Sequence, residues 1–272
     1  MFTSDNIMAM EYDRNTVDEA IDTAVGKFLH IADGQMYSRM PLEILDNIFM
    51  GDFAKNCLRR NIAEAFRGPV LDYDRIRLDG YEQHDPGWDL CLTKHLIRGE
   101  VKSSFRPVDR RTNELYDLQR IVDTLDFKMT AWKKNDPEDK KKYRPERVAD
   151  LIFQVYFPGK ELDPKAAEFF KTKSQLDDNL RTRIDVINVF SKLINLARYK
   201  QPLFFGFNTK ASLERSIALH GAEQCTWTFN GCDRVYWSSK LKDGFSFPEF
   251  VSYLDKMEAL PYFSAMSSVG NL

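Results

Sequence analysis

Two acidic residues and one lysine near the middle of the chain have the types and the spacing of a metal-dependent hydrolytic site. Asp89 begins a short apolar run, and Glu100 and Lys102 stand two residues apart in the next one. A polar turn at 93–95 joins the two runs, which predicts a pair of short strands. Because residues i and i+2 of a strand share a face, Glu100 and Lys102 project together while Val101 turns toward the core. Two carboxylates and an ammonium that converge at a sheet edge can hold a divalent metal ion and a water beside a phosphate.

The elements that position these residues begin with helices in the N-terminal part of the chain. Apolar side chains recur at helical spacing over 17–29 and again over 41–66, where a proline suits the first turn. The stretch 70–81 then alternates loosely in polarity, and Ile76 and Leu78 indicate a first strand within it.

The Glu100 strand is followed by a second group of expected elements. Apolar residues on one face predict a helix over 114–127, and the charged stretch 133–147 has the composition of a loop. The run 151–157 is apolar throughout and ends at a Pro-Gly pair, which is typical of a buried central strand.

The C-terminal part is expected to add helices, a strand and a hairpin. An Asn-Gly pair between two aromatic-rich runs is a strong hairpin signal. The expected elements are two helices within 164–199, a strand at 203–207, hairpin strands at 225–229 and 234–237, and a helix over 248–257. This mixture predicts an α/β (α+β) fold with a mixed central β-sheet flanked by helices.

We expect a single domain over residues 1–272, since a chain of this length can bury a substantial core. Its core spans 41–157, a helical insertion spans 160–200, and a C-terminal hairpin and helix span 203–260. Hydrophobic residues make up 43% and charged residues 29% of the chain, which is ordinary for a globular protein.

The composition also indicates a compartment. No run approaches the roughly 18 uncharged apolar residues of a membrane span, and the N-terminus lacks a signal-peptide pattern. We therefore expect a cytoplasmic protein with no membrane partner. The four cysteines are too few and too scattered for a disulfide framework. His220, Cys225 and Cys232 lie close in sequence, but the absence of a CxxC pair favours ordinary thiols over a structural zinc site.

The balance of charge excludes one class of nucleic-acid protein. The chain has 39 basic and 41 acidic residues, a net charge of −2, whereas nonspecific coat proteins are usually strongly basic. Basic residues nevertheless cluster at 106–111 and 133–147, and a local basic face is compatible with DNA binding. The lysine run at 140–142, taken alone, is interpreted as a solvated loop face.

The order of the expected elements resembles the PD-(D/E)xK nuclease superfamily, the fold of type II restriction endonucleases. A helix and a strand precede the Asp89 strand, the Glu100-Val101-Lys102 strand, a helix and a buried apolar strand. The sequence Gly-Trp-Asp-Leu around Asp89 resembles the Gly-x-Asp-Leu variants of the family, which makes Asp89 a better match than Asp85. The resemblance covers residues 41–157.

This resemblance implies a Mg²⁺-dependent endonuclease that hydrolyses DNA phosphodiester bonds. Asp89 and Glu100, helped by the main-chain carbonyl of Val101, would hold the metal ion, which prefers hard oxygen ligands. Lys102 would complete the catalytic set by orienting or deprotonating the attacking water, or by neutralising the transition state. The charge-stabilising role is favoured because it needs no lowered lysine pKa.

Many family members carry a further acidic metal ligand on the helix that precedes the core strands. The candidates here are Glu43, Asp52 and Glu64, and the sequence leaves this ligand unassigned. Trp88, next to Asp89, is interpreted as a packing residue rather than a platform for stacking bases.

Three functional hypotheses are open. The first is a restriction-type endonuclease that cuts double-stranded DNA as a homodimer, because two strands need two cuts related by two-fold symmetry. The second is another nuclease of the same fold, acting in phage replication, repair or RNA processing. The third is a catalytically silent DNA-binding protein, which the intact Asp89, Glu100 and Lys102 disfavour. The sequence specifies no recognition site, since base contacts come from loops that share no common code.

Overall fold

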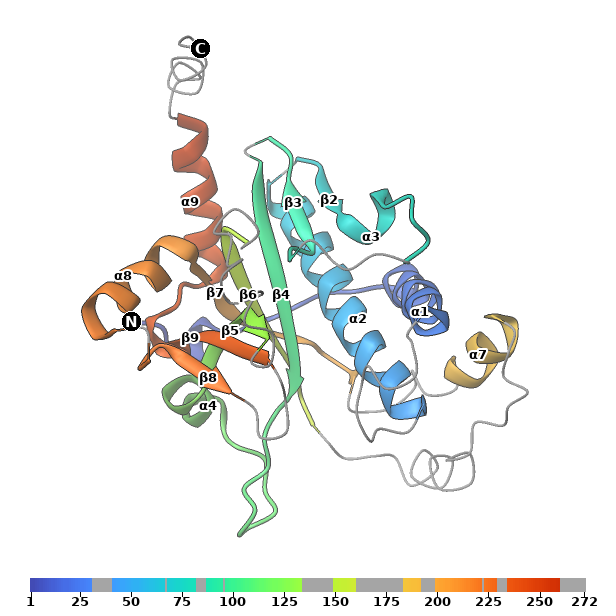
Figure 1. The fold of residues 1–272 in the computed structure, drawn as a ribbon, viewed down its shortest axis with the longest axis horizontal. Coiled ribbons are helices and arrows are strands. Elements are labelled where there is room, and N and C mark those ends of the chain that lie inside the picture. The colour runs from blue at the N-terminus through green and yellow to red at the C-terminus, as the bar shows by residue number, and fades with distance from the viewer. Residues whose placement is uncertain are drawn as a thin grey trace.

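A computed structural model of the chain describes residues 1–30, 41–66, 68–81, 87–94, 96–133, 149–159, 183–191, 199–221, 223–228 and 234–259. In these residues two β-sheets are flanked by helices (Figure 1), which confirms the predicted α/β (α+β) class.

The larger sheet has six strands in the order β1-β7-β6-β4-β3-β2. In chain order they are β1 (Met8–Ala9), β2 (Val70–Asp72), β3 (Leu90–Leu92), β4 (Ile97–Phe105), β6 (Leu151–Phe157) and β7 (Leu203–Thr209). Strand β6 lies between β4, which is parallel to it, and β7, which is antiparallel. Every residue of β6 is buried, which confirms the predicted central strand over 151–157.

The smaller sheet has three antiparallel strands in the order β5-β9-β8. These are β5 (Asp126–Lys133), β8 (Thr226–Thr228) and β9 (Arg234–Lys240). The pairing of β8 with β9 confirms the predicted hairpin strands, and their turn lies outside the described residues.

The helices include the two predicted in the N-terminal part. Their bounds are α1 (Arg14–Leu29), α2 (Pro41–Phe66), α3 (Tyr73–Ile76), α4 (Leu118–Thr124), α7 (Arg183–Phe190), α8 (Lys210–His220) and α9 (Phe247–Ala259), with short 3-10 turns at Ser4–Asn6 and Leu241–Asp243. Helix α1 begins where the Asp13 carboxylate accepts the Thr16 N–H at 2.9 Å. Helix α9 matches the helix predicted over 248–257, and most of 133–147 and 164–199 lies outside the described residues. Among the described helices, none combines the length and apolar character that a membrane span requires.

The six-stranded sheet separates two hydrophobic cores, because side chains of a strand alternate between its faces. On β6, Phe153, Val155 and Phe157 pack with α1, α2 and α9, on what we call the helix face. Ile152 and Tyr156 point the other way and pack with α4, α8 and the smaller sheet, on the small-sheet face. Figure 1 shows α1 and α2 on one side of β4 and the smaller sheet on the other.

The prediction of a strand through 70–81 is wrong beyond Asp72. There the chain turns into α3, because the Asp72 carboxylate accepts the Asp74 N–H at 3.0 Å and caps the helix. Ile76 and Leu78, which indicated a strand, are exposed.

Helix α4 is shorter than the helix predicted over 114–127. Its first turn begins at Asp117, whose carboxylate accepts the Arg120 N–H at 2.7 Å. Asp126 already belongs to β5 and pairs with Lys240 of β9, so a pairing distant in sequence ends the helix early. Strand β5 is thus an addition, and α2, β2, β3, β4, α4 and β6 otherwise follow one another in the predicted order.

Candidate active site

Backbone hydrogen bonds fix the position of Asp89, which immediately precedes β3 and lies beside β4. Its N–H donates to the Gly99 carbonyl at 2.8 Å, and its carbonyl accepts the Tyr73 N–H at 2.9 Å. Its side chain also bonds to the neighbouring strand, because Oδ2 accepts the Val101 N–H at 2.7 Å. Asp89 therefore lies opposite Glu100, one step beyond the paired residues Leu90 and Gly99.

Two of the three predicted site residues, Glu100 and Lys102, share the small-sheet face. Leu90, Ile97 and Val101 all pack in the core of the helix face. Because neighbours along a strand point to opposite faces, the side chains of Glu100 and Lys102 project from the other side. Asp89 stands just before β3, and its carboxylate bonds to the backbone between them. The alternation predicted for Glu100-Val101-Lys102 is therefore the alternation found.

Glu100 and Lys102 form an ion pair at this site. Glu100 is buried, whereas the Lys102 side chain retains 29% exposure, so this face of the strand is open to solvent at the lysine. Burial lowers the pKa of Lys102, but the nearby carboxylates of Glu100 and Asp89 outweigh it, and the net shift is upward. Lys102 is consequently an ammonium at neutral pH in this arrangement.

The donor atoms at the site are of the kind that Mg²⁺ prefers. Within the described ranges, no three His, Cys, Asp or Glu side chains form a metal-binding group. The site instead offers the carboxylates of Asp89 and Glu100 and one main-chain oxygen. Because the N–H and C=O of a strand residue project to the same side, the Val101 carbonyl lies on the β4 edge that faces Asp89. Two carboxylates, a carbonyl and waters fit a Mg²⁺ ion.

Two of the three acidic residues considered on α2 do not join this group. The Asp52 carboxylate is buried on the helix face, 2.6 Å from the Lys27 ammonium. Glu64 is exposed and accepts a hydrogen bond from Arg60 at 3.0 Å. The side chain of Glu43 lies outside the described residues. Of the three candidates, Asp52 and Glu64 are therefore removed.

A buried glutamine that the sequence reasoning missed flanks the lysine. Gln154 of β6 is the register partner of Lys102 on β4, so the two side chains share the small-sheet face. Gln154 is buried, and its amide donates to the Val155 carbonyl at 3.2 Å. Tyr236 of β9 also lies close to Lys102. Neither neighbour has a sequence signal, because each depends on strand pairings between distant segments.

Gly99 in the Gly-Glu-Val-Lys segment is required by packing. A Cβ atom added at this position would lie 2.5 Å from the Phe153 ring, which is closer than real atoms approach. We expect Gly99→Ala to lower the free energy of unfolding by about 1–3 kcal/mol because the ring must move. Urea denaturation followed by circular dichroism measures this change. An unchanged midpoint would show that the ring relaxes freely. Gly51→Ala is the contrasting variant, because its Cβ would meet nothing within 4 Å and alanine favours the interior of α2, so stability should not fall.

The other sequence candidates have structural roles where they are described. Cys225 is a buried thiol whose pKa is raised by desolvation, and Cys232 lies outside the described residues. Trp88 packs edge-on against Tyr73 with ring centroids 5.2 Å apart, consistent with its interpretation as a packing residue. In the basic cluster at 106–111, Arg106 donates to the Tyr116 carbonyl at 2.5 Å, while the arginines at 110 and 111 are exposed.

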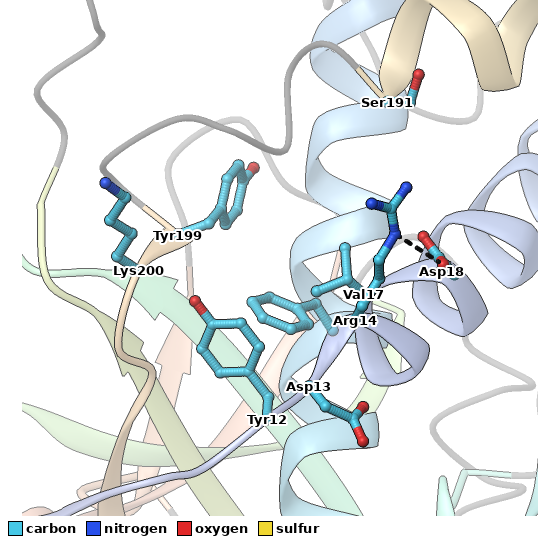
Figure 2. Close-up of a pocket in the computed structure, with 9 residues that line it drawn as sticks. Tyr12, Asp13, Arg14, Val17, Asp18, Ser191, Tyr199 and Lys200 are labelled. Atoms are coloured by element: carbon cyan, nitrogen blue, oxygen red, sulfur yellow. Dashed lines mark ion pairs between the residues drawn. The ribbon is translucent and has the colours of Figure 1, made fainter.

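A separate hollow lies on the helix-face side of the molecule. Its volume is about 340 Å³, and its lining includes aromatic rings of Tyr12, Phe53 and Tyr199. Figure 2 shows Arg14 paired with Asp18 at its rim, where the two side chains lie 3.5 Å apart. The lining contains two carboxylates, those of Asp13 and Asp18, and two cations, Arg14 and Lys200, and it includes none of the predicted site residues.

Comparisons with known proteins give no family assignment. No family model, no curated protein and no solved structure matches this chain.

Proposed function

We propose that the chain is a Mg²⁺-dependent endonuclease of the PD-(D/E)xK type that hydrolyses DNA phosphodiester bonds. One observation carries the proposal. The Asp89 carboxylate accepts the N–H of Val101, the residue between Glu100 and Lys102, and these two form an ion pair. In an ordinary surface hairpin that carries a Glu-Lys ion pair, a third charged side chain is not expected to bond to the backbone between the two paired residues.

The order of elements supports the same class. The helix α2, the strands β2, β3 and β4, the helix α4 and the buried strand β6 appear in the order on which the resemblance rests. The two strands that carry the motif are paired directly, with Leu90 opposite Gly99.

In this mechanism Asp89 and Glu100, with the Val101 carbonyl, would hold Mg²⁺. The ion would supply Lewis-acid polarisation of the scissile phosphate and a more acidic water. The Val101 N–H fixes the Asp89 carboxylate before substrate binds. Lys102 places a positive charge beside the phosphate, where it stabilises the negative charge that develops in the transition state.

The substrate and assembly follow from the same proposal. We propose double-stranded DNA as the substrate and a restriction-type role in the cytoplasm. Cutting both strands at a symmetric sequence calls for two active sites related by a two-fold axis, hence a homodimer. The exposed arginines at 110 and 111 are charges available to phosphates.

Incubation of the purified protein with supercoiled plasmid tests the proposal. We expect discrete linear fragments when Mg²⁺ is present and intact plasmid when a chelator is added. Cleavage that the chelator leaves unaffected would contradict the metal-dependent mechanism. A smear would indicate a nonspecific nuclease, and retarded but uncut DNA in a gel shift would indicate a silent binding protein.

A further inference from the structure

Behind Asp89, across the sheet, the chain buries a group of charged side chains that the proposed mechanism does not use. This ion cluster consists of Lys27 of α1, Asp52 and Lys55 of α2, Asp72 of β2 and Asp74 of α3. Asp52 and Lys55 are 2% exposed and Asp72 is 3% exposed, so the cluster is closed to solvent at its centre. The Lys55 ammonium contacts all three carboxylates, at 2.8 Å from Asp72 and 3.4 Å from Asp52.

The cluster reaches Asp89 through Asp72. On one side, the Asp72 carboxylate binds Lys55 and caps α3 through the Asp74 N–H at 3.0 Å. On the other side, the Asp72 backbone pairs with Leu90, and the next N–H, that of Tyr73, donates to the Asp89 carbonyl at 2.9 Å. The backbone of Asp89 is thus held from both neighbours, by the start of α3 and by β4.

We infer that Asp72, anchored by Lys55, is a positioning residue that fixes the backbone of Asp89 and so the geometry of the proposed metal site. This inference rests on the proposed function for its catalytic consequence. Its physical basis is that a buried ion pair fixes the orientation of the side chains that form it. Apolar side chains of similar volume would fill the same space at a lower cost in free energy, so filling space does not by itself account for the charges. Groups behind a metal ligand orient it, and their loss weakens metal binding.

Amide hydrogen exchange of the full chain, read residue by residue by NMR, tests the structural half of the inference. In Asp72→Ala we expect the amides of Tyr73, Asp89 and Val101 to exchange about tenfold faster than in the wild type, because their local opening becomes easier. The amide of Phe153, in the centre of the sheet, exchanges through global unfolding and should be accelerated less than these three. The matched control is Arg60→Met, which removes the α2 cation that pairs with Asp13 at 2.5 Å and leaves the ion cluster intact.

The dependence of plasmid cleavage on Mg²⁺ tests the catalytic half. In Asp72→Ala we expect the Mg²⁺ concentration for half-maximal cleavage to rise about 10- to 100-fold, with the KM for DNA unchanged. If that variant does not fold, Asp72→Asn, which keeps the capping oxygen and loses the charge, should show smaller changes in the same direction. Equal acceleration at Phe153, or an unchanged Mg²⁺ requirement, would overturn the inference. Wild-type protein that cleaves no DNA would overturn the proposed function instead, and the exchange rates alone would then decide whether Asp72 holds Asp89.

Discussion

Lys102→Met slows Mg²⁺-dependent plasmid cleavage by about 10²- to 10³-fold, the cost of removing one charged group that stabilises a transition state. The methionine keeps the unbranched stem of lysine, so the packing of β4 is retained and only the ammonium is lost. Single-turnover cleavage at saturating DNA measures the effect on the chemical step. We expect unchanged DNA binding in a gel shift, since Lys102 is proposed to act in the transition state.

Two further variants separate the roles at this site. Glu100→Gln keeps the shape of the side chain but removes a proposed metal ligand, so added Mg²⁺ should partly restore its activity and should not restore that of Lys102→Met. Lys240→Met is the matched control, because this lysine pairs with Asp126 at 2.9 Å on the smaller sheet and is exposed. Full activity in Lys102→Met would show that the proposed site is wrong.

The segments that could be predicted from the sequence are those whose pattern is set locally. Helices α1 and α2 repeat apolar residues over several turns, and β6 is apolar over its whole length, so burial and periodicity agree there. The site follows from the same logic. The i, i+2 alternation of Glu100 and Lys102 requires only that β4 be a strand, and Asp89 opposite them requires only that β3 pair with it.

What the sequence could not predict depends on contacts between distant segments. The loose alternation after Asp72 resembles a strand, but a capping carboxylate and an ammonium from α2 turn the chain into α3. Gln154 and Lys102 are 52 positions apart in the sequence. Their pairing depends on the parallel register of β4 and β6. The ion cluster likewise joins Lys27 to Asp74, which no local pattern connects.

Lys55→Met is expected to lower the free energy of unfolding more than any of the other single substitutions. Removing one partner from a buried ion group leaves its counter-charges uncompensated, which costs about 3–5 kcal/mol. Among the described residues, the carboxylates of Asp52, Asp72 and Asp74 would keep Lys27, Arg77 and the more distant Arg75 as nearby cations. Thermal unfolding followed by circular dichroism measures the loss. Arg60→Met, which removes an α2 cation from two half-exposed ion pairs, should cost much less, because solvent screens such pairs.

The double variant Lys55→Met, Asp52→Asn distinguishes lost charge balance from lost packing. Burial raises the pKa of Asp52 above its usual value despite the lysines beside it, so its ionisation in the folded state already costs free energy. A group whose pKa is higher in the folded protein stabilises it at low pH, and this contribution disappears as the pH rises through the folded pKa. Asparagine removes that ionisation, so the double variant should recover part of the stability lost in Lys55→Met. For the same reason, the loss of unfolding free energy in Lys55→Met should shrink as the pH is lowered. The opposite outcome is a loss of unfolding free energy in Lys55→Met that stays constant with pH, together with effects of the two substitutions that simply add in the double variant. That outcome would show that Lys55 contributes packing volume rather than charge.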